Sequence, residues 1–160
     1  MRIGVLGIFL VAAFTQFTVL DSVRVWGIKP DLVMILVIFY AFFGGRREGA
    51  FWGFVAGLLL DAATGSYFGL NALVCMVAGY LAGVVQTALY KDNPFVVSLV
   101  TLLVCLFTGL LHYLFLLYLG IFISPGVALL KITFCGAVYN ALTALLLYRW
   151  FFRGYTKIYR

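Results

Sequence analysis

The chain has 160 residues, of which 66% are hydrophobic and only 10% are charged, and its formal net charge is +6. Ordinary soluble domains carry about 25% charged residues, so this composition excludes a water-soluble fold, which would have almost no polar surface. The length allows one integral membrane domain over residues 1–160, in which lipid or neighbouring helices surround most side chains.

Apolar runs separated by charged residues, prolines and glycines predict six membrane helices. Their ranges are 3–20, 31–44, 48–63, 68–89, 94–120 and 126–152. No small-residue cleavage site follows the first run, so we interpret it as a retained helix and not as a signal peptide. The sequence therefore predicts an all-α, polytopic membrane helix bundle. Three of the helix starts combine a proline with a capping side chain, namely Pro30 with Asp31, Asn93 with Pro94, and Ser124 with Pro125.

The second and third predicted helices are short. Only 14 uncharged residues separate Asp31 from Arg46, a rise of about 21 Å against a hydrocarbon core of about 30 Å. Short elements of this kind are stable inside a membrane where other helices surround them or where they line a cavity. We therefore expect the first half of the chain to be a packed bundle with an irregular centre.

Lysine and arginine are distributed unequally between the two sides that six crossings would create. Three basic residues fall on one side: Arg24, Lys29 and Lys131. The other eight fall on the opposite side: Arg2, Arg46, Arg47, Lys91, Arg149, Arg153, Lys157 and Arg160. The positive-inside rule then places both termini in the cytoplasm. We interpret the basic tail as a contact for anionic lipid headgroups, and we expect no nucleic-acid partner.

A four-residue repeat is the most regular pattern in the chain. It consists of Gly45, Gly49, Gly53, Gly57, Asp61, Gly65 and Gly69. Residues four apart lie on one face of a helix, so Gly49, Gly53 and Gly57 form a groove that another helix can approach closely. The same spacing recurs in two later helices, as Asn71, Cys75, Gly79 and Gly83, and as Gly136, Asn140 and Ala144. Either an internal neighbour or a partner helix could fill the groove.

Asp61 is the most informative single residue, because a carboxylate inside an apolar segment is costly and calls for a functional explanation. By helical rise it lies about 20 Å from Glu48, near the outer edge of the hydrocarbon core. At the C-terminal end of its helix a negative charge is disfavoured by the helix dipole. Three interpretations remain open: an ion pair with Arg24 or Lys29, a contact with a partner protein, or a proton or ion site.

No arrangement of residues predicts catalysis, a metal site or a cofactor. His112 has no second ligand one helical turn away, and Ser66 has no base beside it. The three cysteines fall within apolar runs at spacings that match no metal site, so we interpret them as packing residues. We therefore predict that the protein is not an enzyme.

Residues 27–83 resemble the MreD family of rod shape-determining proteins. The resemblance rests on GIKPDL at 27–32, Gly45 to Gly49, GFVAGLLLD at 53–61 and GSYFGLNA at 65–72. Their order and spacing match the family's Pro-Asp-Leu start, its Gly-Phe-x-x-Gly-Leu-x-x-Asp helix and its Gly-x-Asn-Ala segment. The chain length and the short basic tail are also similar to those of the family.

The resemblance implies a non-catalytic member of the bacterial cell-elongation complex. Proteins of this family work with the bitopic protein MreC, and through it with MreB, a SEDS glycosyltransferase and a penicillin-binding transpeptidase that build lateral peptidoglycan. Their fold resembles the substrate-binding subunits of energy-coupling-factor vitamin transporters. The alternative function is therefore a substrate-binding subunit of a transporter for a vitamin or another small molecule.

Overall fold

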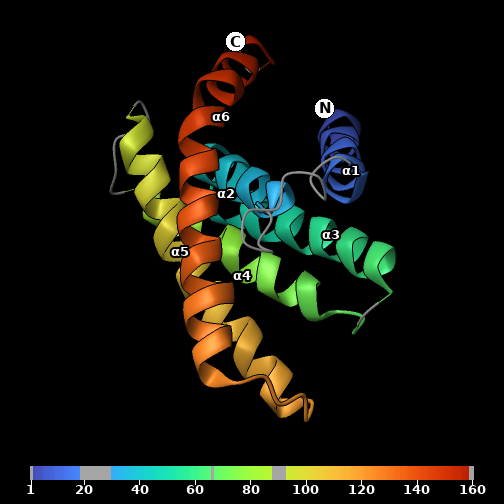
Figure 1. The fold of residues 1–160 in the computed structure, drawn as a ribbon. Helices are drawn as coiled ribbons and strands as arrows, with labels where there is room; N and C mark the ends of the chain where they lie inside the picture. The colour runs from blue at the N-terminus through green and yellow to red at the C-terminus, as the bar shows by residue number, and fades with distance from the viewer. Residues whose placement is uncertain (1, 19–29, 66, 88–92, 159–160) are drawn as a thin grey trace.

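The computed structural model of the chain describes residues 2–18, 30–65, 67–87 and 93–158. Within these ranges the chain forms six α-helices and one π-helical segment, and no strand (Figure 1). The elements are α1 (Arg2–Thr18), α2 (Leu32–Gly44), α3 (Arg46–Thr64), α4 (Leu70–Val85), α5 (Pro94–Tyr118), η2 (Val127–Cys135) and α6 (Gly136–Ile158). The prediction of an all-α bundle of about six helices is confirmed.

Two of the predicted helix starts have the expected capping geometry. Asp31 is the N-cap of α2, and its Oδ1 atom accepts a hydrogen bond of 3.0 Å from the backbone N–H of Met34. Asn93 is the N-cap of α5, where its side chain accepts from the N–H of Phe95 and Pro94 occupies the first turn. Each side chain satisfies a backbone donor that has no acceptor inside its own helix.

The last predicted helix differs from expectation at its start. The turn that begins at Pro125 leads into the π-helical segment η2, and only from Gly136 does the chain continue as the α-helix α6. A π-helix is wider than an α-helix and is frequently found at functional sites. The surroundings of η2 are therefore a place to look for a site.

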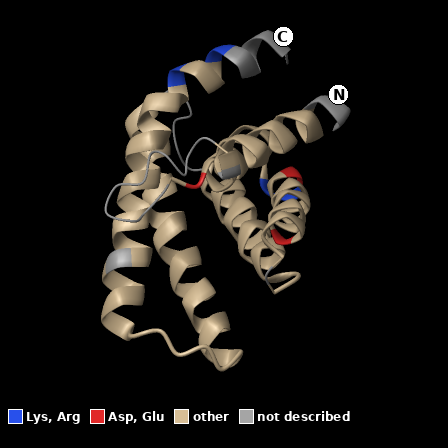
Figure 2. Cartoon of the chain, turned by 45° about the vertical axis from the view of Figure 1, so that its right-hand side comes forward, with Lys and Arg blue, Asp and Glu red and all other residues tan. Residues whose placement is uncertain are grey.

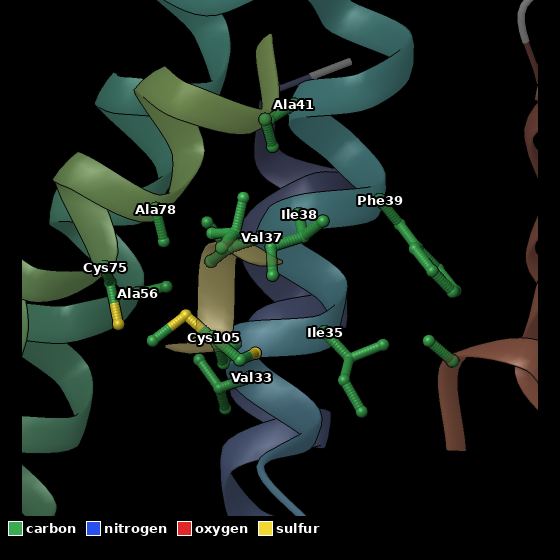
Figure 3. Packing of buried hydrophobic residues seen from close by; sticks show 14 of the residues in the cluster. Val33, Ile35, Val37, Ile38, Phe39, Ala41, Ala56, Cys75, Ala78 and Cys105 are labelled. Atoms are coloured by element: carbon green, nitrogen blue, oxygen red, sulfur yellow. The ribbon is translucent and has the colours of Figure 1, made fainter. Parts of the chain in front are cut away.

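The short helix α2 lies at the centre of the protein and contacts each of the other five α-helices. Its side chains point outward in several directions, so that Ile38 lies on the side of α3 and α4 while Phe39 points toward α6 (Figure 3). Phe39 meets the ring of Tyr148 edge to face, with centroids 6.3 Å apart. Val33, Phe39 and most residues between them are almost completely buried. As expected for a helix too short to span a bilayer unaided, α2 is surrounded by protein.

Two helices are long and apolar enough to cross a membrane within the described part of the chain. They are Pro94–Tyr118 and the continuous stretch Val127–Arg153, which stand side by side on one flank of the molecule (Figure 1). Shorter apolar helices cover Val5–Gln16, Leu32–Gly44 and Leu70–Val85. The molecule thus combines a long helical pair with a compact group of shorter helices.

The glycine face of α3 packs against α4, and these two helices make the most extensive contact in the protein. At four positions the backbones approach so closely that a Cβ atom on the glycine would overlap backbone atoms of the opposite residue. These contacts join Gly49 to Gly79, Gly53 to Cys75, Gly57 to Ala72, and Gly83 to Arg46. Small residues permit this approach, which gains dispersion and polar contacts between the two backbones.

We predict that Gly53→Ala destabilises the folded protein by about 1–3 kcal/mol, because the added methyl group must displace the backbone of Cys75. The matched control is Gly126→Ala, since Gly126 has helical backbone angles and the methyl group of an alanine there would have no neighbouring atom within 4 Å. Thermal unfolding of both purified variants in detergent measures the difference. Equal melting temperatures for the two variants would contradict the close-packing argument.

Candidate functional site

The carboxylate of Asp61 is completely buried and holds the start of the next helix. Its Oδ2 atom accepts hydrogen bonds from the backbone N–H groups of Gly69 at 2.8 Å and Ala72 at 3.2 Å, and Oδ1 accepts from Asn71 at 3.1 Å. One side chain at the end of α3 thus satisfies three donors at the start of α4. Those donors have no acceptor within α4 itself.

This geometry places the negative charge of Asp61 at the favourable end of a helix dipole. The carboxylate lies at the C-terminal end of its own helix but directly against the N-terminus of α4, where backbone N–H groups carry partial positive charge. Arg24 and Lys29, the partners proposed from the sequence, lie outside the described residues. An ion pair with either of them therefore stays a prediction.

Gly65 and Gly69, which complete the four-residue repeat, form the turn between α3 and α4 and do not belong to the packed face. Both have left-handed backbone conformations, with φ angles of 60° and 98°, and a Cβ at either position would have no neighbouring atom within 4 Å. Glycine adopts such angles without steric cost. Their contribution is to reverse the chain so that α4 begins over the Asp61 carboxylate.

A second group of hydrogen bonds fixes the start of α2 deep in the bundle. The backbone N–H of Asp31 donates to Oδ1 of Asn140 at 2.8 Å, and the amide nitrogen of Asn140 lies 3.6 Å from the Cys105 sulfur. The N–H of Val33 donates to Oε1 of Gln16, which is itself buried, at 3.0 Å. The start of α2 is thereby tied to α1, α5 and α6 through side-chain amides.

A pocket of about 360 Å³ lies beside these two helix starts. It is lined by the starts of α2 and α4, the second half of α5, the segment η2 and the first turns of α6. Its polar lining residues are Asp31, Asn71, Cys75, Cys105, Thr108, His112, Tyr113, Thr133 and Asn140. The pocket therefore lies where the starts of α2 and α4 meet the long helical pair.

Sequence reasoning singled out Asn71 but did not foresee the pocket. Thr108 and His112 are four residues apart on α5, and Thr133 and Asn140 are seven apart, so each pair lies on one helical face. Polar residues on one face of an otherwise apolar helix were the feature of the sequence that could have indicated a pocket. What the sequence did not show is that these faces turn toward each other and toward Asn71.

The described residues contain no group of three or more histidine, cysteine or acidic side chains that could hold a metal ion. Among the described lining residues the acidic group is Asp31. Ser66, for which the sequence offers no base, lies outside the described residues. The pocket is thus equipped for hydrogen bonding.

Comparison with known families gives one result that covers nearly the whole chain. The family described as rod shape-determining protein MreD matches residues 2–158. Searches of curated proteins and of solved structures found no significant match. The similarity in fold to vitamin-transporter subunits therefore stays a prediction.

We predict that Asp61→Asn destabilises the protein by about 1–3 kcal/mol, because an amide offers one acceptor oxygen where the carboxylate offers two, and leaves a buried N–H unsatisfied. Glu48→Gln, on the same helix, is the control; its carboxylate accepts from the indole of Trp52 at 3.2 Å. Thermal unfolding in detergent measures both variants.

A double-mutant cycle that combines Asp61→Asn with Arg24→Gln or Lys29→Gln separates the helix cap from an ion pair. If the changes in melting temperature of the single variants add up in the double variants, Asp61 does not pair with Arg24 or Lys29, and the start of α4 is its partner. A melting temperature of Asp61→Asn equal to that of the wild type would contradict the capping role.

Proposed function

Because the chain belongs to the MreD family of rod shape-determining proteins, we propose that it is a non-catalytic membrane scaffold of the bacterial cell-elongation complex. In this proposal the protein binds the bitopic protein MreC within the membrane. Through MreC it is connected to MreB, a SEDS glycosyltransferase and a penicillin-binding transpeptidase, and so helps to organise lateral peptidoglycan synthesis.

The observation that carries the proposal is the family match over residues 2–158. It makes the protein a member of a membrane family that determines rod shape, and this family is not a known family of enzymes. A scaffold needs surfaces for other proteins and no reacting groups. The alternative of a transporter subunit would instead require that a bound small molecule be delivered across the membrane.

The packing of the glycine face bears on where a partner helix would bind. Since α4 covers this face, a transmembrane segment of MreC would need a different surface. In the apolar 18-residue stretch of α5, 33% is buried within the chain, and in that of η2–α6 24% is buried. Large apolar side chains on these helices therefore face lipid or a partner, among them Leu103 on α5 and Leu146 on α6.

We further propose that the protein crosses the membrane several times and that both termini face the cytoplasm. Eight of the 11 lysine and arginine residues fall on the side of the termini when six crossings are assumed. The described basic residues of α6 gather toward its C-terminal end (Figure 2). Positive charge of this kind is retained on the cytoplasmic side during insertion.

We predict that MreC co-purifies with the protein from detergent and that a photo-crosslinking residue at an exposed apolar position captures it. The test positions are Val11, Leu103 and Leu146, which are 67%, 57% and 79% exposed on α1, α5 and α6, respectively. Val37, which is completely buried, is the matched negative control. Purification without MreC, or capture from Val37 as efficient as from the exposed positions, would contradict the scaffold proposal.

For the topology, we predict that a single cysteine at Lys157 in a cysteine-free variant is protected from a membrane-impermeant thiol reagent in intact cells, whereas a cysteine at Ser22 is labelled. Both positions should react once the membrane is permeabilised, which serves as the control. Labelling of position 157 from outside intact cells would reverse the assignment.

A further inference from the structure

We propose that the pocket between α2, α4, α5 and η2–α6 binds a compact molecule that carries hydroxyl and amide groups and no negative charge. This proposal is independent of MreC binding, because it concerns a pocket formed by the elements of this chain alone. Its volume of about 360 Å³ lies in the lower part of the range of small-molecule sites, which is about 300–1,000 Å³.

The lining combines apolar walls with a few converging polar groups, as is typical of small-molecule sites. Met34, Val74, Leu116 and Ile132 provide apolar surface from four different elements. The polar groups come from these elements and from α6, and they line the pocket beside the starts of α2 and α4. A ligand there would be held on several sides at once.

Two of the polar side chains have hydrogen-bonding capacity to spare. The Asn71 amide and the His112 imidazole both belong to residues that line the pocket, and neither side chain is hydrogen-bonded to another described residue. By contrast, Asn140 is engaged with Asp31 and Cys105, and the Tyr113 hydroxyl donates to the carbonyl of Ile123 at 3.3 Å. Polar groups within a membrane bundle are stabilised by a partner.

The kind of free group defines the chemistry of the ligand. A side-chain amide both donates and accepts, and so does a neutral imidazole. Hydroxyl and amide groups complement them, since these also donate and accept. The described lining includes the carboxylate of Asp31 and no lysine or arginine, so an anion would enter without a compensating charge.

The shape of the lining points in the same direction. His112 and Tyr113 supply the aromatic rings among the described lining residues, and they are neighbours on α5. A large planar ring system would therefore lack a second aromatic surface on the opposite wall. A compact molecule with many hydrogen-bonding groups fits this lining better than a flat heteroaromatic one.

The π-helical segment provides a second, independent reason to regard the pocket as functional. Ala128, Ile132 and Thr133 of η2 line it. The Thr133 side chain also packs against Gly109 of α5. A Cβ atom on Gly109 would lie 2.8 Å from the methyl group of Thr133. The π-helix thus forms one wall of the cavity while remaining anchored to α5, and π-helical turns are frequent at binding sites.

The test uses the full chain, produced in cells that lack MreC and placed in lipid nanodiscs. Ligand binding is measured by saturation-transfer NMR. N-acetylglucosamine is the probe, because it is uncharged and carries both hydroxyl and amide groups. Glucuronate, a sugar of similar size that carries a carboxylate and no amide, is the contrasting anionic probe. We expect N-acetylglucosamine to bind and glucuronate to bind at least about tenfold more weakly, which corresponds to about 1.4 kcal/mol.

Two variants locate the binding. Asn71→Leu and His112→Leu remove the free hydrogen-bonding groups at similar size, and each should weaken N-acetylglucosamine binding about tenfold or more. Gln86→Met, which replaces an amide that does not line the pocket, should leave binding unchanged. Melting temperatures confirm that each variant is folded.

Three outcomes would overturn the proposal. They are absence of N-acetylglucosamine binding by the wild-type protein, equal or stronger binding of glucuronate, and undiminished binding by folded Asn71→Leu and His112→Leu variants. The first would show that the pocket does not select hydroxyl and amide groups. The comparison of the two probes on the wild-type protein does not depend on the folding of any variant. Absence of sugar binding would leave the result of the MreC experiment unchanged.

Discussion

Two helices of this protein, α2 and α4, have their first N–H groups satisfied by side chains that lie outside the helix itself, and this hydrogen bonding is the constraint on which the rest of the fold depends. The first N–H groups of a helix have no acceptor within it, and in a membrane protein they must be satisfied by other groups of the protein. Asp61 satisfies three of them at α4, while Asp31, Gln16 and Asn140 provide the acceptors around α2. Three of the six buried polar residues in the described part of the chain, Gln16, Asp61 and Asn140, thus serve the backbone at these two starts.

The small-residue contacts meet a different requirement of a membrane fold. Lipid chains are as apolar as leucine, so helices within a bilayer gain little from hiding apolar side chains from one another. The α3–α4 contact instead brings backbone against backbone, as where Gly53 meets the Cys75 carbonyl. The close contact also bears on the pocket, because the tight α3–α4 pair fixes the Asp61 cap and so positions one wall of the pocket.

Local patterns allowed the fold to be predicted, whereas the pocket depended on long-range geometry. The caps at Asp31 and Asn93 could be predicted because each adjoins a proline, and the glycine face because its repeat matches the helical period. The acceptor role of Asp61 depends on a left-handed turn that brings Gly69 over the carboxylate, which spacing alone does not reveal. Asp31 and Asn140 are 109 residues apart, and no local rule connects them.

The unequal heights of the helices also have a consequence for the surrounding lipid. The 16 residues of α4 rise about 24 Å and the 25 residues of α5 about 37 Å, and both helices carry exposed apolar side chains, such as Tyr80 and Leu103. In the proposed multi-pass topology, the apolar surface that the bilayer meets is therefore shorter on the flank of α4 than on the flank of α5. Adjusting to this mismatch by thinning or tilting costs fractions of a kcal/mol per Å. A neighbouring membrane protein of matching height would relieve that cost, so bilayer thickness itself favours one flank over the other for assembly.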